Sequence, residues 1–96
     1  MALVVTLDRR FGPGGYMDLG MSLYGFMLAA RQHGLDTCAI GALSSYPDVV
    51  RQALVLNEEA AIVRGLALGY ADPDAPVNQT RTTRCELSEY FEVIRA

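Results

Sequence analysis

The segment from Tyr16 or Met17 to about Gln32 constrains the fold more than any other part of the sequence. It is predicted to be a helix, because apolar residues recur at helical spacing and a glycine, the usual residue just past a helix end, follows it. A helix that is apolar almost all round has to be buried almost all round. The apolar residues are Leu19, Leu23, Phe26, Met27 and Ala30 on one stripe, and Met17, Met21, Tyr24 and Leu28 around much of the rest.

A chain of 96 residues cannot wrap such a helix completely. We therefore expect the missing cover to be a second subunit or a further stretch of polypeptide. The 51% apolar content and the absence of low-complexity segments indicate one packed domain rather than a disordered segment.

The remaining pattern predicts three short strands, at Leu3–Leu7, Leu35–Ile40 and Ala60–Leu68. Two further helices are predicted, from Pro47 to about Val55 and from Glu86 or Ser88 to Ile94. The segments between them are predicted to be loops and turns, namely Phe11–Gly15, Leu43–Tyr46, Asn57–Glu59 and Val77–Arg84. This order of strands, helices and tail is typical of an α/β or α+β layer, with an incomplete sheet.

Composition excludes several classes of partner. Eleven acidic and eight basic side chains give a formal charge of −3, so the chain has no overall basic surface for nucleic acid or an acidic membrane. The apolar run Met17–Ala30 is too short and too interrupted to span a bilayer. Two cysteines outside any CxxC pair and the absence of a basic leader favour a cytoplasmic protein with free thiols.

Side-chain catalysis has little support in the sequence. His33 stands alone at a helix end, so neither a zinc site nor a catalytic histidine is expected. Cys38 lies in an apolar strand and is expected to be a small core residue. The glycines of Phe11–Gly15 follow a strand, but without a Walker lysine or dinucleotide spacing they indicate a plain turn. We predict no catalytic side chain and no metal site.

Flavin chemistry would not need such residues, because the cofactor carries the hydride and the protein binds and orients it. Two segments fit that role. Ala39, Ile40 and Gly41 end a buried strand with small residues, which would let a flat ring approach the backbone closely. Arg81 and Arg84 follow the last strand in a polar tail, where a guanidinium could bind a phosphate through two parallel hydrogen bonds.

Six segments together resemble the C-terminal halves of FMN-dependent nitroreductase-family proteins, in the same order and over nearly the whole chain. They are Met17–Gly20, Met27–Arg31, Gly34–Cys38, Tyr46–Arg51, Leu68–Pro73 and Ala75–Asn78. The resemblance implies an α+β fold, a nitroreductase-like α/β sandwich present in part, in which residues 1–96 are the C-terminal portion of one domain whose N-terminal half is absent.

The resemblance also implies a homodimer formed through the Met17–Gln32 helix, with FMN at the subunit interface. In the family, hydride passes from NAD(P)H through FMN to a nitroaromatic, quinone or similar small-molecule acceptor. Carried over by position, Ala39, Ile40 and Gly41 would lie against the flavin ring. Arg84 would hold the phosphate, with Arg81 as a second candidate.

Some positions depart from the family pattern. The arginine- and serine-rich phosphate motif of the N-terminal half has no counterpart in these residues. Tyr24 and Gly25 replace a frequent Gln-Asn pair, while Val55 and Glu86 stand where glycine and proline are common. A truncated, non-catalytic dimerising module that holds no flavin is therefore the alternative function.

Overall fold

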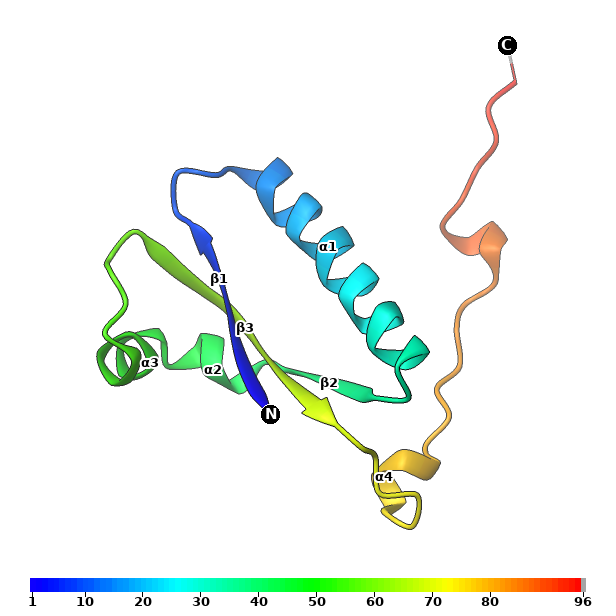
Figure 1. The fold of residues 1–96 in the computed structure, drawn as a ribbon. Helices are drawn as coiled ribbons and strands as arrows, with labels where there is room; N and C mark the ends of the chain where they lie inside the picture. Colours follow the sequence, from blue (N-terminus) through cyan, green and yellow to red (C-terminus); the bar gives the residue numbers. More distant parts are fainter. Residues whose placement is uncertain (96) are drawn as a thin grey trace.

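The computed structural model describes residues 1–95 and places a small antiparallel sheet at the centre of the molecule (Figure 1). Its three strands are β1 (Ala2–Asp8), β2 (Asp36–Ile40) and β3 (Ala60–Gly69), in the order β1-β3-β2. The long strand β3 is therefore central, and both of its neighbours run antiparallel to it. The predicted strands are confirmed to within one residue at each end.

Helices lie on both faces of this sheet. The long helix α1 (Pro13–Gln32) covers one face, and the short helices α2 (Ala42–Ser45) and α3 (Pro47–Leu54) lie on the other (Figure 1). The contact between α2 and β3 is close: a Cβ atom at Gly65 would lie 2.7 Å from Leu43 Cδ1. A glycine at this position thus lets α2 approach the sheet backbone.

The core is small. Among residues 1–95, the buried apolar side chains are Ala30 of α1, Val50 of α3, and Ile62 and Leu66 of β3. Strand β3 supplies two of the four because it is flanked by strands on both sides and by helices on both faces. Between Val5 and Thr6 the pairing with β3 shifts by one residue, as in a β-bulge.

Helix α1 starts earlier than predicted. It begins at Pro13, so most of the expected Phe11–Gly15 loop is the first helical turn. The reason is that proline has a helix-compatible φ and no N–H to satisfy at this position. The predicted end is confirmed: His33 is the C-cap, and Gly34 follows with a φ of 73°, in the left-handed region that favours glycine.

The other local differences concern short segments. The predicted loop Leu43–Tyr46 is largely the single turn α2, and the turn α4 (Pro76–Gln79) includes the first three residues of the segment Val77–Arg84, which was expected to be irregular. The predicted last helix is wrong, because only a 3₁₀ turn, η1 (Leu87–Glu89), forms within it. A helix of so few residues needs tertiary packing to persist, and every described residue from Pro76 to Arg95 is exposed.

The chain exposes far more surface than a self-contained protein of its size. Its accessible surface is 8006 Å², whereas a folded monomer of this mass exposes about 5,400 Å². The radius of gyration is 16.9 Å, compared with about 12.5 Å for a compact domain of this length. The excess includes the outer stripe of α1, formed by Met17, Met21, Tyr24 and Leu28, which are 70, 66, 65 and 52% exposed.

An ion pair joins the end of α1 to the start of β2. The Arg31 guanidinium contacts one carboxylate oxygen of Asp36, and the other oxygen accepts a hydrogen bond from the Ala71 N–H at 3.0 Å. One carboxylate therefore connects the long helix, the edge strand and the point where the chain leaves β3.

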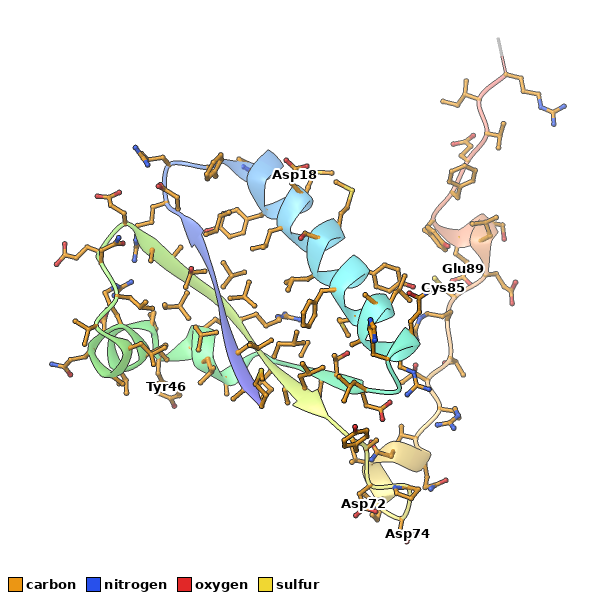
Figure 2. The ribbon with its side chains drawn as sticks, viewed as in Figure 1. Asp18, Tyr46, Asp72, Asp74, Cys85 and Glu89 are labelled. Atoms are coloured by element: carbon orange, nitrogen blue, oxygen red, sulfur yellow. The ribbon has the colours of Figure 1, made fainter. Side chains whose placement is uncertain are left out.

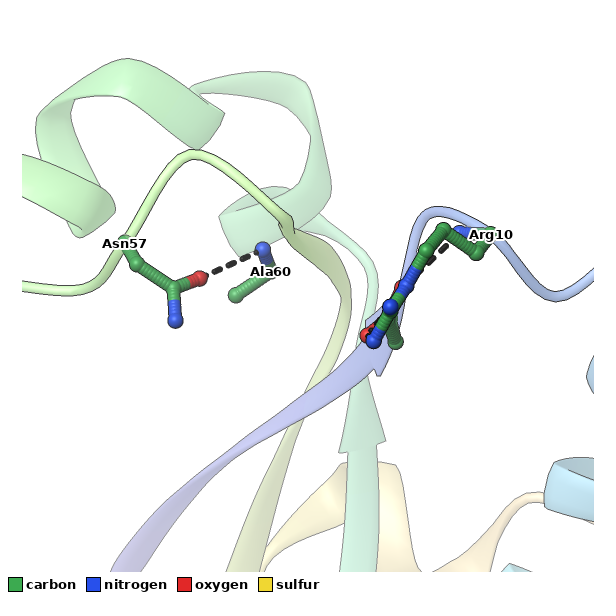
Figure 3. A network of polar contacts seen from close by, with 4 residues as sticks. Arg10, Asn57 and Ala60 are labelled. Atoms are coloured by element: carbon green, nitrogen blue, oxygen red, sulfur yellow. Dashed lines mark hydrogen bonds and ion pairs between the residues drawn. The ribbon is translucent and has the colours of Figure 1, made fainter.

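A second ion pair lies at the other end of the sheet, where a terminal guanidinium nitrogen of Arg10 lies 2.6 Å from the Asp8 Oδ2 atom (Figure 3). Nearby, Asn57 Oδ1 accepts a hydrogen bond from the Ala60 N–H at the start of β3 (Figure 3). The hydrogen bonds from Arg10 lower the pKa of Asp8 to about 2.

We expect Arg10→Ala to return the pKa of Asp8 towards its ordinary value of 3.8. Because the pKa of Asp8 is lowered in the folded state, its ionised carboxylate contributes to stability above about pH 4. This contribution is lost as the pH falls towards 2. NMR titration of the Asp8 carboxyl carbon in both proteins measures the shift. An unchanged low pKa in the variant would show that Arg10 is not the cause.

Candidate functional site

A largely apolar cleft of about 380 Å³ lies between α1 and the sheet. Helix α1 contributes one wall through residues spaced three and four apart, and β3 and β2 form the floor. Its size is within the range of small-molecule pockets. The lining residues are Tyr16, Leu19, Gly20, Leu23, Tyr24, Met27, Ala39, Val63, Arg64, Gly65 and Leu66.

The predicted ring-binding segment lies at one edge of this cleft. Ala39 lines it and is exposed, which follows from its place on the edge strand β2, opposite Leu66 of β3. Ile40 ends the strand and is half-buried. Gly41 is exposed at the start of α2, where its carbonyl accepts a hydrogen bond from the Ser44 hydroxyl at 2.7 Å. Of these three residues, Ala39 alone lines the cleft, while Ile40 lies close to Gly65 on the side of the sheet that α2 contacts.

The predicted phosphate ligands lie elsewhere. Arg81 and Arg84 are exposed on the tail that leaves the body after α4, and Figure 2 shows the adjacent Cys85 outside the layers of helix and sheet. Their guanidinium groups bond to nearby tail atoms: Arg81 to the carbonyls of Asn78 and Thr80, and Arg84 to Thr82 Oγ1 and the Thr83 carbonyl. The structure therefore does not bring the arginines and the Ala39–Gly41 segment together within one chain.

Arg64 also lines the cleft, although it is not among the site residues predicted from the sequence. It is exposed in the middle of β3, and among residues 1–95 its guanidinium makes no hydrogen bond or ion pair. A charged side chain in an otherwise apolar strand was the available signal, because alternation places it on the same face as Leu66. It is the one cation in the lining of the cleft.

Other kinds of site have no support in the described part of the chain. No three His, Cys, Asp or Glu side chains gather there as metal ligands, and none of its helices is both long and apolar enough to cross a bilayer. Cys38 is exposed on β2, so the expectation of a core cysteine was wrong. The reason is that β2 is an edge strand, of which one flank and part of each face stay uncovered.

Comparison with known proteins decides the family. The profile of the nitroreductase family matches residues 4–70, which include most of β1, all of α1, β2 and β3, and the Ala39–Gly41 segment. The chain belongs to the nitroreductase family. The resemblance inferred from six sequence segments is thereby confirmed, together with the partial α+β fold.

Curated relatives match almost the whole chain. A chloronitrobenzene nitroreductase from Comamonas testosteroni is 39% identical over 94% of the chain, and a nitrobenzene nitroreductase from Ectopseudomonas oleovorans is 37% identical over 94%. In both cases the match covers 40% of the relative. The chain thus spans about two-fifths of the length of these nitroreductases.

Solved structures give the same result in three dimensions. The FMN and NADPH-dependent nitroreductase NfnB from Sphigopyxis sp. strain HMH matches 99% of this chain with a TM-score of 0.93 and 34% identity. The FMN-dependent nitroreductase NfnB from Mycobacterium smegmatis, solved in complex with NADPH, matches 98% with a TM-score of 0.88. The matches cover 43% and 42% of those chains, so this nitroreductase portion is one part of a larger fold.

Proposed function

We propose that this chain is the C-terminal portion of a cytoplasmic FMN-dependent nitroreductase. In the assembled protein, hydride would pass from NAD(P)H through FMN to a nitroaromatic, quinone or similar acceptor. The observation that carries the proposal is the match of 99% of the chain, with a TM-score of 0.93, to an FMN and NADPH-dependent nitroreductase. The assignment of this activity to the assembled protein, rather than to 96 residues alone, follows from the two-fifths coverage.

The residues present fit the ring of FMN. Ala39 is exposed and lines the apolar cleft, Gly41 is exposed two residues further on, and apart from its two chain neighbours no atom would lie within 4 Å of a Cβ at Gly41. A flat aromatic ring could therefore approach the backbone on this side without displacing a side chain. When bound, FMN supplies the hydride chemistry. The role of Ala39, Ile40 and Gly41 is to hold and orient its ring.

The phosphate of FMN is proposed to bind to the tail, the segment that follows α4. Arg84, and secondarily Arg81, carry guanidinium groups that fit a phosphate through paired, charge-assisted hydrogen bonds. One terminal nitrogen of Arg84 is bonded within the tail, and this leaves its other donors available. Because both arginines are exposed on the tail, binding FMN would require the tail to lie over the ring site in the assembled protein.

The interface of the proposed homodimer is assigned to helix α1. Met17, Met21, Tyr24 and Leu28 recur at helical spacing and form an exposed outer stripe of α1, and Tyr24, at the margin of this stripe, also lines the cleft between α1 and the sheet. An exposed apolar stripe of this kind marks a protein interface. The dimer interface proposed here is therefore a helix-to-helix contact between two copies, centred on Met21 and Tyr24.

The test of the flavin assignment is the affinity for FMN of the assembled protein, in which the complete domain is present. Arg84→Ala is expected to weaken FMN binding by about 1.5–3 kcal/mol, because one charge-assisted contact to the phosphate is lost. Quenching of flavin fluorescence on titration measures the affinity. Arg95→Ala, which removes an equal charge further along the tail, serves as the control and should leave it unchanged.

An unchanged affinity in Arg84→Ala would show that the phosphate is held elsewhere. The alternative function, a dimerising module that holds no flavin, is favoured by the separation of the arginines from Ala39–Gly41 within one chain. Flavin absorbance near one FMN per chain in the purified 96-residue protein would eliminate this alternative.

A further inference from the structure

Within residues 1–95, Arg64 is the one charged residue that lines the cleft between α1 and the sheet. Strands β2 and β3 pair antiparallel as far as Ile40 and Gly65. Gly41 and Arg64 are the next residues along the two strands, so they lie near each other. Arg64 is also two residues from the partner of Ala39, and side chains at that spacing share a face of the sheet. Arg64 thus lies in the cleft next to the segment that we propose for the flavin ring.

The charge of Arg64 has no counter-charge in the described part of the chain. The residue is exposed, and among residues 1–95 its guanidinium makes no hydrogen bond or ion pair. None of the described residues that line the cleft is acidic. Three other arginines differ in this respect, because Arg10, Arg31 and Arg51 each form an ion pair with an aspartate. An anion that pairs with Arg64 therefore has to come from outside these residues.

Enclosure of the cleft would make such an anion necessary. The chain exposes 8006 Å², whereas a folded monomer of its mass exposes about 5,400 Å², so we expect much of its surface to be covered in the assembled protein. Water can solvate the guanidinium of Arg64 only while the cleft is open. A guanidinium enclosed by apolar residues without an anion would be strongly destabilising. We therefore expect a negative group against Arg64 once the domain is complete.

The walls of the cleft indicate what else the anion carries. Tyr16 and Tyr24 line it and are 47 and 65% exposed, so their rings are accessible to a ligand. An apolar and aromatic lining with a single charged group is typical of small-molecule sites, and the volume of about 380 Å³ is within their range. An aromatic carboxylate fits both features. Its ring would pack against the tyrosines, and its carboxylate would accept two parallel hydrogen bonds from the guanidinium.

We propose that Arg64 is a specificity-determining residue, which binds the carboxylate of an anionic nitroaromatic acceptor in this cleft. That the ligand is an acceptor rests on the proposed function, to which Arg64 adds the charge of the substrate. An acceptor with a carboxylate would bind in preference to an uncharged acceptor of the same shape. A carboxylate opposite the nitro group on the ring would leave the nitro group free for reduction.

The probes are 4-nitrobenzoate and 4-nitrobenzamide, which have nearly the same shape and differ in charge. Isothermal titration calorimetry measures their dissociation constants in the assembled protein, without NAD(P)H so that neither probe is reduced. The carboxylate is expected to bind at least tenfold more tightly than the amide. In the 96-residue chain alone the preference should fall to about threefold, the size of an exposed ion pair, because the cleft is open to water.

The matched variants are Arg64→Met and Arg64→Lys. Methionine removes the charge and should abolish the preference for the carboxylate, whereas lysine keeps the charge without the planar fork and should retain part of it. Arg95→Met removes an equal charge from the exposed tail and is the control that should bind both probes like the original protein. If Arg64→Met fails to fold, the Arg64 Nε–H resonance of the unsubstituted protein still decides the question, because 4-nitrobenzoate should shift it and 4-nitrobenzamide should not.

Three results would overturn the proposal. They are equal affinities for the two probes, a preference that survives in Arg64→Met, and an Arg64 Nε–H resonance that 4-nitrobenzoate leaves unchanged. A preference that is present in the chain alone and lost in the assembled protein would also overturn it. That result would show that a carboxylate of the remaining polypeptide neutralises Arg64.

Kinetics and flavin binding separate this inference from the function on which it rests. In the active protein, Arg64→Met should raise the KM for 4-nitrobenzoate at least tenfold, with little change in kcat and none in the KM for 4-nitrobenzamide. A protein that binds FMN and reduces both probes with equal KM would retain the flavin assignment and reject the role of Arg64. A protein that prefers 4-nitrobenzoate through Arg64 but binds no FMN would support the anion site and reject the flavin assignment.

Discussion

Leu66→Ala is expected to lower the free energy of unfolding by about 2–5 kcal/mol, the range for a leucine truncated in a core. Leu66 is 3% exposed, the lowest value among the core residues, and lies on the central strand opposite Leu3 of β1 and Ala39 of β2. Its removal leaves a void where all three strands meet. Because the core is this small, the loss is a large share of the free energy of unfolding, which is only marginal even in ordinary domains.

Urea denaturation followed by circular dichroism measures this change, with both proteins at one concentration because self-association adds to apparent stability. Leu54→Ala is the matched control, since it removes the same atoms from a residue 51% exposed at the end of α3. It should alter the free energy of unfolding by less than about 0.5 kcal/mol. Equal losses in the two variants would show that β3 does not form the core.

The sequence predicted those parts of the fold that depend on local pattern. The β-branched and apolar runs identified β1 and β3, and Gly34 marked the end of α1. These signals are local, because strand propensity and a left-handed cap act over a few residues. The early start of α1 at Pro13 was missed since glycines next to a proline are also typical of a turn.

Features that depend on neighbouring strands and chains were harder to predict. Cys38 was expected in the core because it lies in an apolar strand, but the sequence does not say which strand is at the edge. The last helix was predicted from Glu86 onwards, yet in the described residues that segment has no surface to pack against and forms only the turn η1. Tertiary context overrides propensity in both cases.

The candidate site was also predictable only where it depends on the local sequence. Small residues at the end of a strand indicated Ala39 and Gly41, and the structure places Ala39 on an apolar cleft. Arg64 was overlooked because the strand pattern was used to define the core, although a guanidinium within an apolar run is a signal in itself. The arginines of the tail remain a prediction, since their relation to the cleft depends on polypeptide that the chain does not supply.

The apolar circumference of α1 leads to the second large expected effect. Met21→Glu should raise the dissociation constant of the homodimer at least about 30-fold, or about 2 kcal/mol, the size of an interface hot spot. Met21 is 66% exposed at the centre of the outer stripe, so a carboxylate there would have to be buried against the same position of the second copy. In a twofold contact each substitution acts twice, which increases the loss. Sedimentation velocity over a range of concentrations measures the constant.

Ala29→Glu is the control that separates an interface effect from a change in the helix. It adds the same charge to an exposed position of α1, but Ala29 lies on the flank between the outer stripe and the residues that face the sheet. Its dimer should therefore dissociate like that of the original chain, and its helix content should match that of Met21→Glu. If Met21→Glu self-associates as tightly as the original chain, α1 is not the dimer interface.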